Sequence, residues 1–176
     1  MDLDAPLTPE LPDFDAPLDM LRACHQRMLA QCDLLDRLVA HIAQQGLDAD
    51  ARSAIGRVST YFNTSAVQHH MDEEQDLFPL LSRQSLKIAD VVHALRKQHT
   101  ALDESWKALG ALLKNPAELA EHQPDFAQGV ERFCALYRDH IRKEEKELLA
   151  LAQHILSSQQ LAALGNSMAA RRGVKR

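Results

Sequence analysis

Apolar residues recur at intervals of three and four along most of the chain, which is the spacing of one buried face of an α-helix. The period-two alternation of a half-buried strand is absent. The pattern predicts four long helices, at about 16–45, 50–82, 87–114 and 125–156, and a short fifth helix that starts at Ser157 or Ser158 and reaches about Ala170. Asp15 and either Asp48 or Asp50 should cap the first two helices, and Gly46 should end the first.

Four long helices with brief connections are typical of an all-α, up-down-up-down four-helix bundle, which residues 17–156 should form. Four of the seven prolines fall within the first 17 residues, so residues 1–16 are expected to be an extended N-terminal arm. The linker between Asn115 and Pro124 has room for one helical turn. Residues 157–176 are expected to be the short helix and a basic tail.

Composition and charge exclude several classes of protein. The net charge of −5 argues against a nucleic-acid partner, and no apolar run approaches the roughly 20 residues of a membrane span. The beginning of the chain lacks the features of a signal peptide, so a cytoplasmic protein is expected. Three cysteines without C-x-x-C spacing, Cys24, Cys32 and Cys134, are expected to be free core thiols.

Polar side chains interrupt each of the four predicted apolar stripes. They are His25 in the first helix, His69 and Glu73 in the second, His99 in the third, and His140 and Glu144 in the fourth. A single inward histidine is more often a hydrogen-bonded core residue, but four of them on four stripes, together with two glutamates, indicate a metal site. The residues expected on the surface include His41, His93, His122, His154 and Glu145.

Two of these stretches share the motif His-x-x-x-Glu-Glu-x-x-Leu, which occurs at 69–77 and again at 140–148. A histidine and a glutamate four positions apart lie one helical turn from each other, so each copy directs both groups at one point. His70 and Glu74 have the same spacing and form an alternative pair. Because the second copy aligns with His69, the pair that begins at His69 is favoured, and His70 and Glu74 are interpreted as flanking or outer residues.

The six donors favour a pair of metal ions. If each carboxylate bridges the two ions, each ion receives about two nitrogens and two oxygens, which leaves positions open for a further ligand. Nitrogen and oxygen donors without thiolates suit iron, with manganese and zinc less favoured. An open, histidine-rich, two-metal site inside an apolar bundle is suited to a small diatomic ligand.

These residues resemble the hemerythrin-like, or HHE cation-binding, domain over roughly residues 18–155. The most specific part is His69-x-x-x-Glu73-Glu74-x-x-Leu77-Phe78-Pro79, which Gln98-His99 and the second copy of the motif complete. The resemblance implies a bundle around a non-haem pair of oxo- or hydroxo-bridged iron ions. It also implies a family whose members bind oxygen, sense iron or oxygen, or respond to nitric oxide and peroxide.

The chain departs from two groups of that family. Oxygen-carrying hemerythrins have a fifth histidine at the position of Leu95 and an aspartate five residues after the last histidine, whereas here Glu144 follows by four. The set of four histidines and two glutamates is similar to that of bacterial iron-centre repair proteins. Those proteins carry an additional N-terminal cysteine pair that this chain lacks.

The sequence therefore predicts a di-iron protein with terminal ligands His25, His69, His99 and His140 and with bridging ligands Glu73 and Glu144. Its expected role is to bind or sense oxygen, nitric oxide or peroxide, in oxidative or nitrosative stress or in iron handling. Two alternatives stay open. One is an enzyme that consumes peroxide or nitric oxide, and the other is a regulatory module whose iron or redox state controls association with a partner or with a second copy of the chain.

Overall fold

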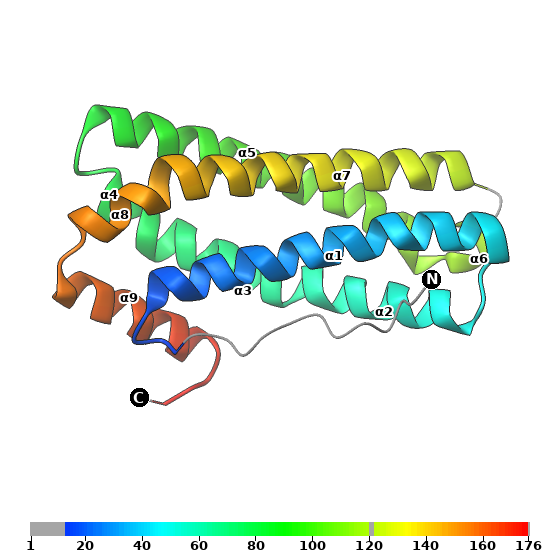
Figure 1. Cartoon of the computed structure of the whole chain (residues 1–176), viewed down its shortest axis with the longest axis horizontal. Coiled ribbons are helices and arrows are strands. Elements are labelled where there is room, and N and C mark those ends of the chain that lie inside the picture. The colour runs from blue at the N-terminus through cyan, green and yellow to red at the C-terminus, as the bar shows by residue number, and fades with distance from the viewer. Residues whose placement is uncertain (1–12, 120–121, 176) are drawn as a thin grey trace.

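The computed structural model describes residues 13–119 and 122–175, and every regular element among them is helical. Four long helical segments lie side by side with their axes roughly aligned (Figure 1), which confirms the prediction of an all-α bundle. Within these ranges, no helix is both long and apolar enough to cross a membrane. Most of the predicted N-terminal arm, residues 1–12, and Arg176 of the basic tail lie outside the described residues.

Two of the four segments are continuous and two are interrupted. The continuous ones are α1 (Pro17–Gln45) and α5 (Leu86–Lys114). The second segment consists of α2 (Ala49–Asn63), α3 (Ser65–Met71), a π-helical turn η1 (Asp72–Leu77) and α4 (Phe78–Leu81). The fourth consists of α7 (Gln123–Glu144), a π-helical turn η2 (Glu145–Leu149) and α8 (Ala150–Ile155). A single turn, α6 (Pro116–Leu119), lies in the linker, and α9 (Ser158–Arg171) follows the bundle.

The helices begin and end largely where the local chemistry predicts. Asp48 accepts a hydrogen bond from a backbone N–H in the first turn of α2, and Ser85 and Ser157 do the same for α5 and α9. Gly46, with a φ of 77°, ends α1 in a conformation that favours glycine. Both α1 and α5 pack against α2 and α7, so the four segments surround a shared interior.

The predicted cap at Asp15 is wrong, because α1 starts one residue later. The capping position belongs to Ala16, and no side chain there accepts a hydrogen bond from the first turn. Pro17 occupies the first turn instead, where its fixed φ suits the helix and its missing N–H removes a donor that would otherwise need a partner. A proline thus replaces the cap as the local signal for the start of this helix.

The second segment is bent at Thr64, where the sequence predicted an unbroken helix. Thr64 has a φ of −128° and a ψ of −76°, outside the helical range, and its hydroxyl donates to the carbonyl of Thr60 at 2.7 Å. Side chains of the run Asn63-Thr64-Ser65 compete with the backbone for hydrogen bonds, which favours an interruption. The bend separates α2 from the shorter α3 that carries the first copy of the motif.

The two π-helical turns change which residues face the interior. A π turn contains about one residue more than an α turn, so the buried face beyond it moves one position along the chain. Beyond η2 the buried residues are Ala152 and Leu156, whereas Leu151, which an unbroken α-helical stripe through His140, Glu144 and Leu148 would bury, is 42% exposed. Beyond η1, Leu81 is buried in place of the partly buried Leu80. The predicted stripes are correct up to each π turn and wrong by one residue after it.

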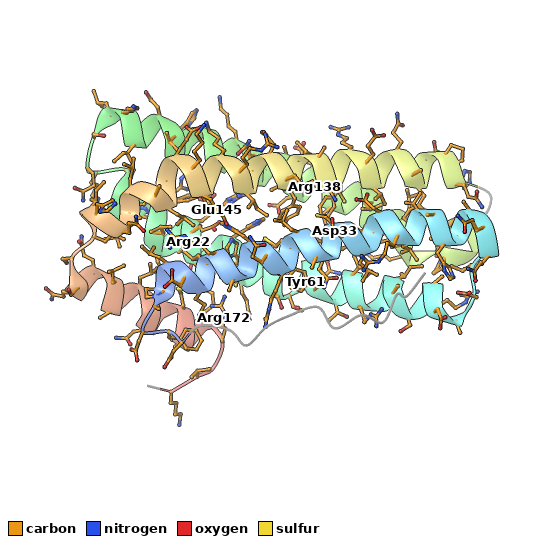
Figure 2. The ribbon with its side chains drawn as sticks, in the orientation of Figure 1. Arg22, Asp33, Tyr61, Arg138, Glu145 and Arg172 are labelled. Atoms are coloured by element: carbon orange, nitrogen blue, oxygen red, sulfur yellow. The ribbon has the colours of Figure 1, made fainter. Side chains whose placement is uncertain are left out.

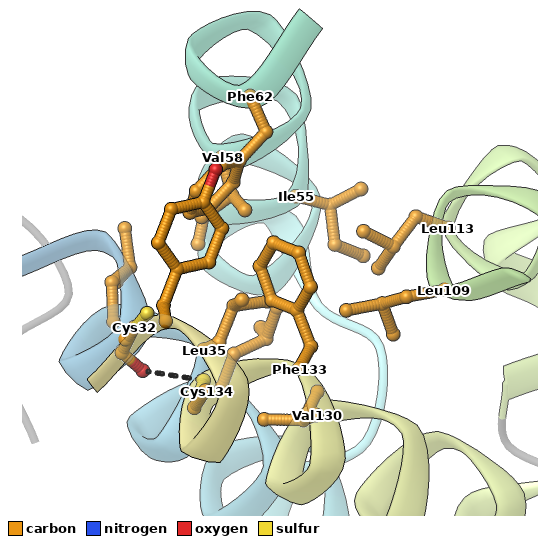
Figure 3. Close-up of a cluster of buried hydrophobic side chains, with 14 of the residues drawn as sticks. Cys32, Leu35, Ile55, Val58, Phe62, Leu109, Leu113, Val130, Phe133 and Cys134 are labelled. Carbon is orange, nitrogen blue, oxygen red and sulfur yellow. Dashed lines mark hydrogen bonds between the residues drawn. The ribbon is translucent and has the colours of Figure 1, made fainter. Parts of the chain in front are cut away.

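The apolar interior consists of two clusters at opposite ends of the bundle. The α2-side cluster, part of which Figure 3 shows, includes Met28, Leu35, Ile55, Phe62, Leu109, Val130 and Phe133. The α9-side cluster includes Leu18, Leu21, Phe78, Leu95, Leu148, Leu164 and Met168. Each long segment contributes to both clusters and carries its predicted donors between them.

The three cysteines are free and buried, as predicted. The thiol of Cys134 donates to the backbone carbonyl of Cys32 at 3.6 Å within the α2-side cluster (Figure 3). One histidine prediction is wrong, because His41 is only 5% exposed rather than on the surface. Its Nε2 lies 2.9 Å from a carboxylate oxygen of Asp48, so the cap of α2 also serves as the partner of a buried imidazole.

The C-terminal helix α9 packs against α1 and η1 and closes one end of the bundle. Arg171 and Arg172 both form ion pairs with Asp72, whose side chain is fully buried. Arg172 Nη2 lies 2.7 Å from Asp72 Oδ2, and Arg171 also reaches Asp76 at 2.8 Å. Figure 2 labels Arg172 at the end of α9. Asp72 directly precedes Glu73, so α9 is attached at the turn that carries a predicted donor.

Candidate metal centre

The six side chains that the sequence pattern singled out lie together between the two apolar clusters. His25 belongs to α1, His69 to α3, Glu73 to η1, His99 to α5, and His140 and Glu144 to α7. None of them is more than 5% exposed. All four helical segments thus direct polar groups into one buried region.

Four of these residues form a first group that could hold one cation. His25, His69, Glu73 and Glu144 each place one potential ligand atom within 4.8 Å of the others. His69 Nε2 lies 2.6 Å from Glu73 Oε1, and His25 Nε2 lies 3.3 Å from Glu144 Oε2. All four side chains are fully buried. The group offers two imidazole nitrogens and two carboxylates without access to solvent.

A second group consists of His70, Glu73, His99 and His140, again with ligand atoms within 4.8 Å of one another. His99 Nε2 lies 3.2 Å from Glu73 Oε2 and 3.2 Å from His140 Nε2. His70, which the sequence pattern interpreted as a flanking residue, therefore joins the candidate donors. With it, this group offers three imidazoles and one carboxylate.

Glu73 belongs to both groups, and its two oxygens face different ones. Oε1 lies near His69 and His25 of the first group, whereas Oε2 lies near His99 of the second. Glu144 Oε2 also lies between the groups, 3.3 Å from His25 Nε2 and 3.5 Å from His140 Nε2. Carboxylates between two sets of imidazoles have the arrangement that a bridge between two cations requires.

The chemistry of the donor set fits cations. Several buried atoms in the centre form no aligned hydrogen bond, namely Nε2 of His25, both ring nitrogens of His69, and both oxygens of Glu73 and Glu144. Unsatisfied buried polar atoms are rare and cost free energy, and a bound cation is one way to satisfy them. The N and O donors lie within coordinating reach of one another, so metal ions match both their kind and their position.

The second glutamate of each motif contacts an imidazole of a different helix. Glu145 Oε1 lies 3.1 Å from Nδ1 of His25, and Glu74 Oε1 lies 2.7 Å from Nδ1 of His99. Arg96 in turn holds the other oxygen of Glu74 at 2.5 Å. The prediction that Glu145 belongs to the solvated surface is wrong, since its side chain is only 35% exposed and contacts His25 (Figure 2). Such carboxylates orient an imidazole and raise its basicity.

The remaining two imidazoles have neutral partners. Nδ1 of His140 lies 3.2 Å from the amide oxygen of Gln98, and the amide nitrogen of Gln98 donates to Asp139 at 3.1 Å. The thiol of Cys24 interacts with the ring of His69. Nδ1 of His25, of His99 and of His140 therefore each has a side-chain partner, whereas Nδ1 of His69 has no aligned hydrogen bond.

Burial and mutual charge separate the pKa values of the donors. Burial alone would raise the pKa of Glu73, but its histidine partners, His69 foremost, hold it well below the usual range. The pKa of Glu144 is raised by burial and by the charge of Glu73. Burial lowers the pKa of His140 to about 3, whereas for His25 the carboxylates outweigh burial and raise the pKa well above its ordinary value. An incoming cation would displace the protons that this cluster holds.

Sequence reasoning left His70 open as the alternative to His69 or as an outer residue, and it missed the contact of Glu145 with His25, although a signal was present. Both belong to doublets, His69-His70 and Glu144-Glu145, whose members point about 100° apart on a helix. Two identical adjacent residues can therefore serve two different positions. The stripe analysis chose one member of each doublet, because it asked only which residue lay on the most apolar line.

Two comparisons with known proteins match most of this chain. The family model described as "Hemerythrin HHE cation binding domain" matches residues 16–152. A protein of Haemophilus influenzae, described only as an "Uncharacterized protein", is 33% identical over 163 residues. That similarity covers 92% of this chain and 93% of the relative.

Proposed function

The chain belongs to the hemerythrin HHE cation-binding family, and on this premise we propose that it is a non-haem di-iron protein that binds or senses a small diatomic molecule or an oxidant. The observation that carries the proposal is the pair of four-residue groups that share Glu73. Oxygen, nitric oxide and peroxide are the ligands in question, and the setting is oxidative or nitrosative stress or iron handling in the cytoplasm.

In this proposal the predicted donors hold two bridged iron ions. His25 and His69 bind one ion, and His99 and His140 bind the other. Glu73 and Glu144 lie between the two ions. Support comes from the opposite orientation of the two Glu73 oxygens and from the unpartnered atoms in the first group. Iron is favoured because imidazoles suit it, whereas manganese prefers oxygen donors and a closed tetrahedral zinc site would leave some of the six donors unused.

Bound iron would supply open coordination positions and a reversible change of oxidation state. The chain supplies orientation and exclusion of water. Glu74 and Glu145 fix the rings of His99 and His25, and the apolar clusters on both sides keep bulk solvent from the centre. A small uncharged molecule fits this environment better than a large polar substrate.

The deciding experiment is metal analysis combined with absorption spectra of aerobically purified protein, under oxygen, under nitric oxide and after anaerobic reduction. We expect about two iron ions per chain and an oxo-bridge band that changes with each gas. His69→Ala should abolish both, whereas His93→Ala, a change at an exposed histidine of α5, should leave both intact. The proposal would be wrong if the purified protein held no iron and showed no oxo-bridge band, and if His69→Ala altered only its stability.

A regulatory module is the second candidate, and the attachment of α9 favours it. Arg171 and Arg172 bind Asp72, the neighbour of the shared Glu73, so a change at the centre would alter how α9 packs against the bundle. An iron- or redox-dependent change in oligomeric state, measured by sedimentation, would support this role. Turnover of peroxide or nitric oxide that Glu73→Ala abolishes would instead identify an enzyme.

A further inference from the structure

His70 follows His69 directly, yet its ring lies in the other group of donors. Its centroid is 4.2 Å from that of His99, with the two planes 22° apart, and 6.1 Å from that of His140. One nitrogen of His70 lies within 4.8 Å of ligand atoms of Glu73, His99 and His140. Adjacent residues on a helix diverge by about 100°, and this divergence brings the two rings of the doublet to two different groups.

The other contacts of His70 do not account for its position. The hydroxyl of Tyr137 lies 3.5 Å from Nε2 of His70, which is at the outer limit for a hydrogen bond. The rings of Tyr137 and His70 are nearly parallel, with centroids 6.0 Å apart. Neither contact gives Nε2 of His70 a short hydrogen bond.

The two groups also differ in their exposure to solvent. Every side chain of the first group is fully buried. In the second group His70 is partly exposed and His99 is 5% exposed. The second group therefore lies nearer to solvent than the first, and His70 is its most exposed member.

We propose that His70 is a fifth imidazole ligand, which completes a solvent-facing metal position together with Glu73, His99 and His140. This inference rests on the proposed function, because it concerns the second of the two ions. The two positions are then unequal. Glu144, like Glu73, lies between the two positions, so they differ in imidazoles: the sealed position has two and the solvent-facing position has three.

The test is titration of metal-free protein with Co²⁺, followed by calorimetry and by the visible absorption bands of the bound ion. Wild-type protein should bind two ions. His70→Ala should bind the first ion normally and the second at least about 100-fold more weakly, beyond the 10- to 100-fold that loss of an outer partner gives. Millimolar imidazole should restore the second ion in His70→Ala, because the vacated position is open to solvent. His93→Ala is the matched control and should bind two ions as the wild type does.

A second variant, His70→Asn, keeps much of the side-chain volume and serves if His70→Ala loses its helical circular dichroism. Two ions bound with wild-type affinity and unchanged bands in either folded variant would overturn the inference while leaving the proposed function intact. Loss of both ions would also overturn it, because the sealed position should not need His70. A wild-type protein that binds neither Co²⁺ nor iron would contradict the proposed function itself.

Discussion

The two adjacent glutamates of each motif contact different parts of the centre. In each copy the first glutamate points at the centre, and the second holds an imidazole that belongs to the other half of the chain. Glu74 of the second segment holds His99 of the third, and Glu145 of the fourth holds His25 of the first. The two halves therefore exchange outer partners, so each half needs the other to orient its lone histidine.

Asp48 offers a residue-scale prediction far from the centre. Its carboxylate both caps α2 and accepts from the buried His41. Asp48→Ala should lower Tm by about 5 °C, the scale of a lost helix cap, as measured by thermal unfolding. Asp48→Asn keeps a capping side chain and should lower Tm less.

The stability of the wild type and that of Asp48→Asn should also depend differently on pH. The backbone N–H of Ala51, followed by His41, lowers the pKa of Asp48 below its ordinary value. A carboxyl with a depressed pKa stabilises the fold above its unfolded pKa, and this stabilisation is lost as pH falls through the folded pKa. The gap in Tm between wild type and Asp48→Asn should therefore narrow as pH falls below the ordinary pKa of an aspartate and through the lowered pKa of Asp48. A gap that is unchanged from pH 7 to pH 2 would contradict this role of the charge.

At this scale the sequence predicts the buried donors better than their outer partners. All six predicted donors lie at 5% exposure or less, because a polar residue on an apolar stripe is visible in the pattern itself. The contacts of His70, His41 and Glu145 depend on how segments distant in sequence meet. Glu145 and His25 are 120 positions apart, and no local spacing relates them.

Among the elements, the π-helical turns are the feature that pattern analysis could not place. Each begins within one residue of the central glutamate of its motif, η1 at Asp72 and η2 at Glu145. Helix existence, most boundaries and the stripes upstream of these turns follow from a period of 3.6, and the predicted stripes fail where the period itself changes. Such turns are frequent at functional sites, which agrees with their position beside the candidate centre.

A pair of deletions tests whether η2 contains one residue more than a regular helix needs. Lys146 is exposed within η2, and Glu131 is exposed within the regular part of α7. Removing Lys146 should convert the π turn to an α turn and leave the faces of α7 and α8 in place, with Tm lower by about 5 °C or less. Removing Glu131 should rotate one part of α7 by about 100° against the other and prevent cooperative folding.

Circular dichroism and thermal unfolding of the two deletion variants give the comparison, and their equal size makes each a control for the other. Similar damage from both deletions would show that η2 does not absorb the missing residue. Co²⁺ titration of the Lys146 deletion adds a functional measurement. A regular α turn in place of η2 would move Glu145 away from His25, so the titration tests whether that contact affects metal binding.

At the scale of the whole molecule, the polar centre separates the two apolar clusters, and α9 covers the end of the bundle that contains the α9-side cluster. The apolar clusters on either side provide the burial that drives folding, whereas the layer between them contains charges that are costly without cations. Asp72 lies at the boundary, fully buried, and its two arginines come from the last helix of the described chain. The packing of α9 and the position of Glu73 are therefore linked, because Asp72, which holds α9, directly precedes Glu73.

The double variant Arg171→Ala/Arg172→Ala tests this link. It leaves the carboxylate of Asp72 buried without a cation and should cost about 3 kcal/mol of unfolding free energy, at the low end for a broken buried pair because the arginines are 14% and 17% exposed. Urea unfolding measures this cost. Hydrogen exchange in α9 should become faster, and Co²⁺ should bind more weakly because Asp72 anchors the turn that carries Glu73.

Arg138→Ala is the matched control, since Arg138 of α7 pairs with Asp33 and Asp36 of α1 in an exposed network (Figure 2). Loss of an exposed network should cost about 1 kcal/mol or less, because solvent and salt already screen it. It should leave Co²⁺ affinity unchanged, because none of its members touches the centre. Equal losses of stability in the two variants, or an unchanged Co²⁺ affinity in the double variant, would show that α9 merely covers the end of the bundle. A selective loss in the double variant would mean that the last helix helps to hold the shared carboxylate in place.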